Sequence, residues 1–464
     1  MDRTLRLEKE SIGKLLYQFS LPAIIGMMVM ASYNIVDRIF VGRGVGALAI
    51  SGIAITFPAI IIFMAFGMLV GIGATAILSI RLGEKKIQEA EQTLGNALTL
   101  SVVIGIILTA IFYIFLDPLL ILFGGTGEVL EYARDFSKVM LIGGVFQMIS
   151  FTMNNLIRGE GNPKMAMTTM IIGAVLNTIL NPIFIFGLNW GIQGSAWATV
   201  ISQGISSAWV LLYFFGKKSH VHFHFANLKL RKNIVSKIFS IGVSPFIMQI
   251  AASIVIMIFN KSLAHYGGDL AVASMAITNA ITMFIVMPIF GINQGIQPIL
   301  GYNFGAKLYH RVRRVFELGI LAATVICVLG FVTVIFFSGD IVRFFERGNE
   351  ELLYIGSRAL RIYLFMLPVV GYQIISAAYF QAVGKPKFSL ILTVARQVGI
   401  LIPAILILPD FFGLDGVWAA GPVSDLLSGI LSAVFLIREM KILKKLELEM
   451  KEVRPEPKIT PASF

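Results

Sequence analysis

Twelve long apolar runs divide the chain, and short charged or Gly/Pro-rich breaks separate them. The runs lie at approximately 15–39, 47–80, 93–116, 132–157, 165–187, 193–216, 238–263, 271–304, 315–337, 354–380, 388–409 and 416–437. One helical crossing of a bilayer core needs roughly 20 apolar residues. These runs are apolar on every side and do not alternate with a period of two, so they predict helices and not barrel strands. We therefore expect an all-α integral membrane protein with twelve transmembrane helices.

Composition points to the same environment. Apolar residues make up 57% of the chain and charged residues only 14%, with a mean hydropathy of +0.83. Soluble domains carry about 25% charged residues. The chain contains one cysteine, Cys327, so no intrachain disulfide can form. The lipid bilayer is therefore the expected partner of most of this surface.

The positive charge is unevenly divided between the two sides of the predicted bundle. Of the 38 Lys and Arg residues, 28 fall in the two ends and one set of alternate breaks, and 5 fall in the other set. Cytoplasmic loops carry such an excess, so we expect a multi-pass protein of the cell inner (cytoplasmic) membrane with both termini in the cytoplasm. The net charge of +12 then faces anionic headgroups, and we expect no nucleic-acid partner.

The two halves of the chain repeat each other. Pro22 matches Pro245, 223 positions later, and the turn 161–164 matches 384–387 at the same offset. Six helices per half give both halves the same orientation, a parallel repeat typical of secondary transporters, in which rocking of the halves alternates access. We expect an N-terminal segment at 1–14, an N-lobe with helices 1–6 at 15–216, a linker at 217–237, a C-lobe with helices 7–12 at 238–437 and a tail at 438–464.

The prolines shared by the two halves are candidates for a mechanical role. Pro22 and Pro245 each remove a backbone donor from a transmembrane helix and loosen it. Both are candidate hinges for a rocking motion, and a static kink is the alternative.

Asp37 in the first helix is the principal candidate for ion coupling. Intramembrane carboxylates are costly and typically serve ion pathways or proton relays. Asn177 and Asn181 lie four residues apart, on one face of the fifth helix, where their amide oxygens could join Asp37 around a cation. The alternatives are a salt bridge between Asp37 and Arg38 at the membrane interface, and ordinary interhelical hydrogen bonds for the two asparagines.

Five further polar or charged side chains inside the runs are candidates for contact with a substrate. We expect these residues to line a substrate cavity, and they are Gln203, Gln249, Gln373, Arg396 and Asp425. An unpaired charge in the bilayer is costly, so Arg396 of the eleventh helix and Asp425 of the twelfth are predicted to form an ion pair. The pair is compatible with either a structural or a functional role. The repeat aligns Asp425 with Gln203, so the halves differ in chemistry at this position.

Four segments together resemble the multidrug and toxic compound extrusion (MATE) family, in its prokaryotic DinF-like or MepA-like branch. They are 36–42, 156–164, 177–186 and 396–403, and the resemblance extends over about 15–440. It implies a MATE-type fold and an antiporter that expels amphipathic, mostly cationic small molecules in exchange for H⁺ or Na⁺. Related proteins commonly carry an aspartate where this chain has Asn181, which leaves the choice of coupling cation open.

Two other functions are alternatives for a membrane protein of this kind. A flippase for lipid-linked oligosaccharide or polysaccharide, from the same superfamily, requires a strongly cationic central cavity. A membrane-embedded enzyme requires a nucleotide-binding domain, paired mid-membrane aspartates or a His/Glu metal motif, and the sequence has none of these. We therefore expect a monomeric transporter without catalytic residues, bound metal or cofactor, apart from the coupling cation.

Overall fold

The computed structural model describes residues 3–216, 218–345 and 348–453, and all regular structure in these residues is helical. The α-helices are α1 (Arg3–Lys9), α2 (Ile12–Gly44), α3 (Ala47–Gly83), α4 (Ile87–Ile114), α5 (Leu116–Leu122), α6 (Gly127–Gly159), α7 (Pro163–Pro182), α8 (Gly191–Phe215), α9 (Lys232–Gly305), α10 (Tyr309–Phe345), α11 (Glu350–Tyr363), α12 (Leu367–Ala382), α13 (Pro386–Val394), α14 (Ile402–Phe412) and α15 (Leu414–Val453). Two π-helical turns, Ile183–Gly187 and Ala395–Leu401, and one 3₁₀ turn, Phe225–Leu228, complete the described elements.

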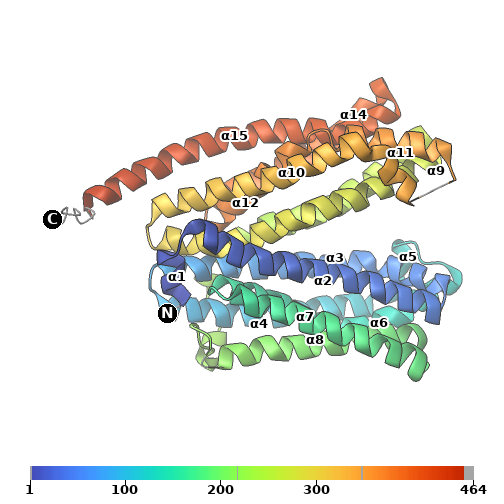
Figure 1. The fold of residues 1–464 in the computed structure, drawn as a ribbon. Coiled ribbons are helices and arrows are strands. Elements are labelled where there is room, and N and C mark those ends of the chain that lie inside the picture. Colours follow the sequence, from blue (N-terminus) through green and yellow to red (C-terminus); the bar gives the residue numbers. More distant parts are fainter. Residues whose placement is uncertain (1–2, 217, 346–347, 454–464) are drawn as a thin grey trace, which may run out of the picture.

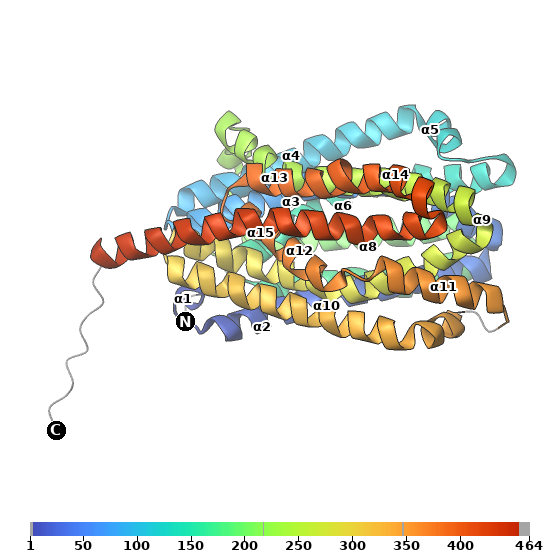
Figure 2. The same ribbon diagram turned by 90° about the horizontal axis from the view of Figure 1, so that it is seen from above.

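The helices make twelve crossings. Ten helices of the described chain are long and apolar enough to span a membrane, and the pair α11 and α12, bent by 47°, makes a further span. The 74-residue α9 is broken at Gly268, whose φ of 64° and ψ of −161° are not helical. Figure 2 shows α9 turning at the end of the bundle opposite to the termini, so α9 supplies two crossings. The predicted runs 238–263 and 271–304 lie on either side of this turn, and the prediction of twelve helices is confirmed.

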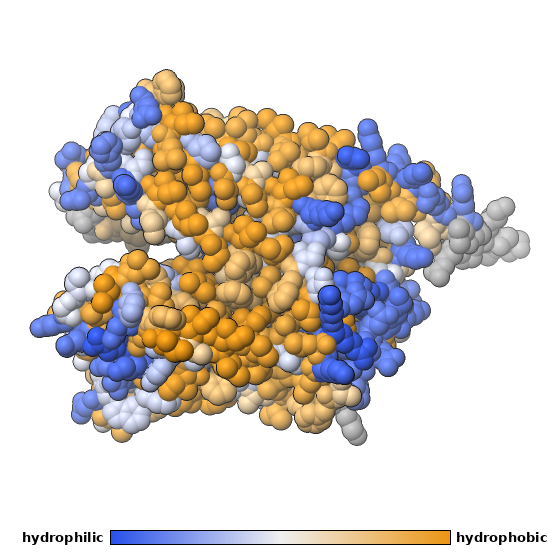
Figure 3. Space-filling model, turned by 180° about the vertical axis from the view of Figure 1, so that it is seen from behind, coloured by the Kyte–Doolittle hydropathy of each residue, from blue (hydrophilic) through white to orange (hydrophobic). Residues whose placement is uncertain are grey.

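The helices form two lobes that lie side by side (Figure 1). The N-lobe contains α2–α8 and the C-lobe contains α9–α15. We call the end of the bundle that holds α1 and the last turns of α15 the termini end, and the opposite end, with α5 and α14, the far end. Apolar side chains form a broad band around the middle of the molecule, and polar side chains gather at both ends (Figure 3). This apolar band is where the bundle would lie within the bilayer, with the two polar ends in the headgroup regions and water.

Near the termini end the two lobes touch through their backbones. A Cβ atom on Gly83 would overlap the carbonyl oxygen of Tyr302, and one on Gly305 would overlap that of Ile80. These contacts are equivalent under the internal repeat, since Gly83 matches Gly305 and Ile80 matches Tyr302. Small residues at such positions allow close helix packing in membranes.

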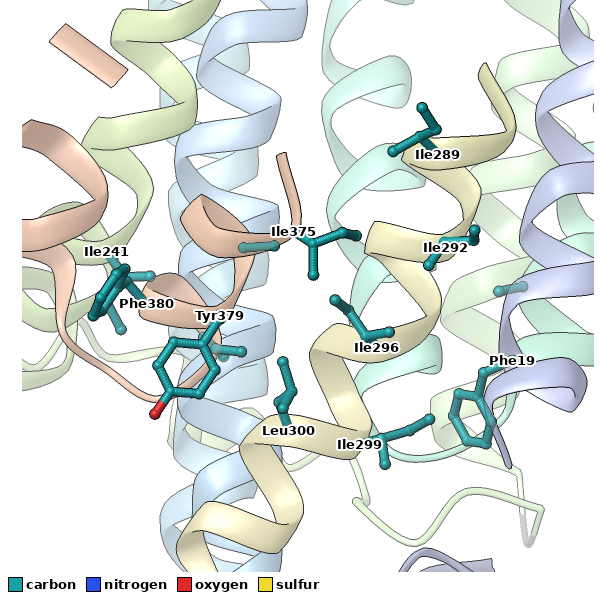
Figure 4. Packing of buried hydrophobic residues seen from close by; sticks show 14 of the residues in the cluster. Phe19, Ile241, Ile289, Ile292, Ile296, Ile299, Leu300, Ile375, Tyr379 and Phe380 are labelled. Carbon is teal, nitrogen blue, oxygen red and sulfur yellow. The ribbon is translucent and has the colours of Figure 1, made fainter. Parts of the chain in front are cut away.

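An apolar core fills the space around this contact. The buried α9 isoleucines, among them Ile296, lie between Phe19 of α2 and Ile375 of α12 (Figure 4). The short helix α1 and the residue that follows it also join the lobes, because Arg311 of α10 donates hydrogen bonds to the carbonyl oxygens of Leu7 and Glu10 at 3.0 and 2.7 Å. The lobes are therefore closed against each other at the termini end.

Toward the far end the lobes separate. Contacts between them reach the middle of the bundle, where the rings of Phe66 and Phe246 lie 4.9 Å apart and Gln294 Nε2 lies 3.6 Å from Met27 Sδ. Beyond this level Figure 3 shows a notch between the two halves of the surface. The structure thus has a cleft that opens at the far end.

Candidate ion-coupling site

Asp37 lies in the far half of α2, on the side that faces the other N-lobe helices. It is ten residues beyond Met27, or roughly 15 Å along the helix axis. Its Oδ1 atom accepts hydrogen bonds from Asn181 Nδ2 of α7 and, at 2.8 Å, from Ser195 Oγ of α8. Both donors are completely buried, while Asp37 itself is half-buried. Three helices therefore position one carboxylate at a partly accessible point of the lobe.

A chain of amide and hydroxyl groups extends from this carboxylate into the lobe. Asn181 Nδ2 also lies 3.2 Å from Asn177 Oδ1, and Asn177 Nδ2 donates to Thr199 Oγ1 at 3.0 Å. The side-chain oxygen of Asn181, Oδ1, is buried without a hydrogen-bond partner. The structure thus brings together all three residues proposed from the sequence for ion coupling, and it leaves an oxygen that a cation or a proton donor could satisfy.

The alternative pairing of Asp37 with Arg38 is not seen. Arg38 is exposed, and the described residues contain no ion pair between the two side chains. All the hydrogen-bond donors on Asp37 are neutral.

Ser195 and Thr199 were missed in the sequence. They lie four residues apart on α8, as Asn177 and Asn181 do on α7, so each pair lies on one helix face. This spacing is a signal that the sequence offered. Hydroxyl groups are common inside these helices, however, and most of them bond to their own backbone, as Ser202 does.

A second polar cluster lies in the C-lobe. Arg396 Nε and Nη2 lie 2.9 and 2.8 Å from Asp425 Oδ1, so the predicted ion pair is confirmed. Gln373 Nε2 donates to the backbone oxygen of Asp425, and Ser424 Oγ donates to that of Arg396 at 2.9 Å. Arg396 belongs to the π-helical turn Ala395–Leu401. Such turns are frequent at functional sites.

The other residues proposed from the sequence join neither cluster among the described contacts. Gln203 packs against Gly143, and its Oε1 atom is buried without a partner. Gln249 is half-buried on α9, where its backbone oxygen accepts from Ser253. Pro22 and Pro245 are buried, and α2 and α9 continue through them. Their role as hinges stays a prediction.

Glu160, which follows α6 at the termini end, is a further buried carboxylate. It has no exposed surface and accepts hydrogen bonds from Tyr213 Oη, from Ser219 Oγ at 2.6 Å and from the backbone nitrogen of His220 at 3.3 Å. Burial raises the pKa of Glu160 to about 7, although these donors act in the opposite direction. The carboxylate therefore titrates near neutral pH.

We expect Glu160→Gln to stabilise the protein above pH 7. A carboxyl whose pKa rises from 4.5 to about 7 on folding contributes stability that is present below pH 4.5 and is lost as the pH rises through 7. At pH 8 the variant should be more stable by about 3 kcal/mol, and near pH 5 the difference should fall below about 1 kcal/mol. Thermal unfolding followed by tryptophan fluorescence measures both values.

The matched control is Glu439→Gln in the C-lobe. Glu439 is also buried and accepts from Tyr379, but it forms an ion pair with Lys385. Removing this carboxylate leaves the ammonium group unpaired, so the control should lose stability at pH 8. A Glu160→Gln protein that is no more stable than wild type at pH 8 contradicts the expectation.

Comparison with known proteins decides the family. The family model described as MatE matches two segments, residues 22–183 and 245–407, which are the two repeats. The chain belongs to the MATE family. It is a multi-pass membrane protein, and the fold expected from the resemblance is confirmed.

Relatives with this fold extend over almost the whole chain. The multidrug export protein MepA of Staphylococcus haemolyticus (strain JCSC1435) is 28% identical over 94% of this chain and 95% of its own length. The MepA protein of Staphylococcus aureus (strain MSSA476) is also 28% identical, over 93% and 95%.

Solved structures agree in fold. A crystal structure described as MATE in the bent conformation superimposes with a TM-score of 0.90 at 25% identity, over 96% of this chain and 99% of that one. An outward-facing multidrug resistance MATE transporter gives 0.88 at 25% identity, over 95% and 98%. A transporter from Pyrococcus furiosus, described as having a binding pocket of reverse polarity, gives 0.88 at 26% identity, over 95% and 98%.

Proposed function

We propose that this MATE protein is a secondary active multidrug exporter, which expels amphipathic, mostly cationic compounds in exchange for H⁺ or Na⁺. The observation that carries this proposal is the Asp37 carboxylate, held by the neutral donors Asn181 and Ser195. Because no cation of the described chain pairs with Asp37, an exchangeable cation can balance its charge. The names of the relatives, multidrug export proteins, support the substrate class.

The coupling follows from competition for one carboxylate. A proton on Asp37 removes its charge and with it the attraction for a cationic compound, whereas Na⁺ would need the amide and hydroxyl oxygens of Asn177, Asn181 and Thr199 as additional ligands. Either cation, once bound, changes the hydrogen bonds between α2, α7 and α8. In this way loading of the site can alter the packing of the N-lobe.

The excess of Lys and Arg at the termini end supports a cytoplasmic position for this end. The cleft at the far end then opens to the outside, and the contacts at Gly83 and Gly305 close the cytoplasmic side. Loading of substrate from the cytoplasm requires these contacts to separate while the far end closes. Pro22 and Pro245 lie on the two helices, α2 and α9, that also carry lobe-to-lobe contacts, which supports their role as hinges.

The flippase alternative is less well supported. It requires free positive charge in the cavity, but Arg396 is neutralised by Asp425. With Arg396 and Asp425 paired, Asp37 is the charged residue of the proposed sites that has no partner of opposite charge in the described chain.

The test uses purified protein in liposomes that contain a fluorescent cationic dye. An inward-directed or outward-directed gradient of either Na⁺ or pH is imposed, and dye movement is recorded for each. Movement that depends on one gradient and is abolished by a matching ionophore supports the proposal and identifies the cation. Dye movement that neither gradient changes contradicts it, and transport of an anionic lipid-linked sugar in place of the dye would favour the flippase.

A further inference from the structure

Three phenylalanines, two of them exposed and the third partly buried, form a cluster where α8 is followed by the linker. The ring of Phe215 lies 4.9 Å from that of Phe223, which lies 5.5 Å from that of Phe225. Phe215 is 53% exposed and Phe225 is 75% exposed. Aromatic rings in mutual contact that remain this exposed indicate a surface that is covered by something other than water.

Three basic side chains follow the aromatic cluster along the linker. Lys229, Arg231 and Lys232 are all exposed, and none of them pairs with a carboxylate of the described residues. Leu230 between them is 43% exposed. We call Phe215, Phe223, Phe225 and these three cations the linker patch.

The linker is held in a defined shape against α4. Asn96 Nδ2 donates to the backbone oxygens of Asn227 and Lys229 at 3.2 and 3.3 Å, while Asn96 Oδ1 accepts from the backbone nitrogen of Arg231 at 2.7 Å. Thr99 Oγ1 donates to the oxygen of Leu228 at 2.8 Å. A side chain at Gly95 would overlap Asn227, so the close docking needs glycine there. The backbone beside the linker patch is thus held in place by α4, and the patch is preformed.

The depth of the patch matches the edge of the bilayer. Phe215 is the last residue of the apolar helix α8, and α4, which carries Asn96, begins nearby at Ile87. Figure 2 shows the linker beside α4, at the rim of the bundle. Rings at this level can enter the boundary between headgroups and acyl chains, and the cations can reach the phosphates.

We propose that the linker patch binds anionic phospholipids of the leaflet at the termini end. Its phenylalanines cover the upper acyl chains, and Lys229, Arg231 and Lys232 pair with headgroup phosphates. This interaction is independent of the transported compound. It anchors the linker to the bilayer beside α4, up to the first residue of α9, Lys232.

The single cysteine of the chain allows a direct test of depth. In a Cys327→Ser background, Phe225→Cys carries a nitroxide label, and the protein is placed in phosphatidylcholine vesicles with or without phosphatidylglycerol. We expect the label to collide more often with oxygen than with a water-soluble nickel complex, and to lie deeper when phosphatidylglycerol is present. A label that is accessible to the nickel complex in both kinds of vesicle overturns the proposal, as does a depth independent of phosphatidylglycerol.

A second measurement avoids the label. Native mass spectrometry counts the phosphatidylglycerol molecules that the otherwise wild-type protein retains. Lys229→Gln with Lys232→Gln should weaken retention by about 30-fold, the effect of two cations near an anionic surface. The matched control, Lys444→Gln with Lys445→Gln, removes the same charge from exposed positions of α15. Equal retention by the two double variants overturns the proposal.

Discussion

Asp37→Asn is expected to abolish cation-coupled export while leaving the protein folded. Asparagine has nearly the same size as aspartate, and its side-chain oxygen can still accept from Ser195 as Asp37 Oδ1 does. The variant has no charge that a proton or Na⁺ can balance, however, so binding of the coupling cation no longer changes the electrostatics of the site. In the liposome assay, gradient-driven dye movement should fall to the rate of liposomes without protein.

The control for this variant is Asp410→Asn. Asp410 lies at the far end of α14, where it accepts from Tyr266 at 2.9 Å, and it takes no part in either polar cluster. It should retain coupled transport with wild-type dependence on the gradient. Both variants should unfold at the wild-type temperature to within a few degrees. Coupled transport that survives undiminished in Asp37→Asn contradicts the central mechanism.

Neutralising either Arg396 or Asp425 alone is expected to destabilise the C-lobe strongly. The two side chains join α15 to the π-helical turn Ala395–Leu401, and Asp425 is buried. Removing one partner leaves the other charge without compensation, which typically costs about 3–5 kcal/mol. Asp425→Asn and Arg396→Gln should therefore each lower the unfolding temperature and the yield of folded protein.

The double variant should recover most of this loss. With both charges removed, no uncompensated charge remains, and the bond from Gln373 reaches only the backbone oxygen of Asp425. If the stability losses of the two single variants add in the double variant, the expected coupling between the two side chains is contradicted. Transport by the recovered double variant then separates the two roles, since a structural pair leaves export intact and a functional pair does not.

The hydrophobic pattern by itself determined the helices and their number. A run of apolar residues long enough to cross a bilayer has one low-energy conformation there, because only a helix satisfies its backbone hydrogen bonds within the segment. The repeat, read from matches such as Pro22 with Pro245, likewise predicted two equivalent six-helix halves. Gly268 shows how local this information is, because the apolar runs on either side of it predict two helices but not the turn that joins them.

The candidate residues of the coupling site could be named from the sequence, but their contacts could not be derived. Asn177 and Asn181 share a helix face by spacing alone. The bonds from Asn181 and Ser195 to Asp37, however, span 144 and 158 residues of sequence. These bonds depend on how α2, α7 and α8 are rotated against each other, and periodicity that is apolar on every side does not specify that rotation.

The contact between the lobes and the position of the linker also depend on tertiary packing. The backbone contact between the lobes at Gly83 and Gly305 depends on the crossing of α3 with α9, which no local pattern reports. The sequence predicts a linker at 217–237 but not its position, because Asn96, which holds it against α4, lies 131 residues before Asn227. The sequence determined which segments enter the bilayer, because burial in lipid is a property of each segment. Only packing between segments decided which polar side chains meet, because one helix rotation or one lobe contact brings together residues that are far apart in the chain.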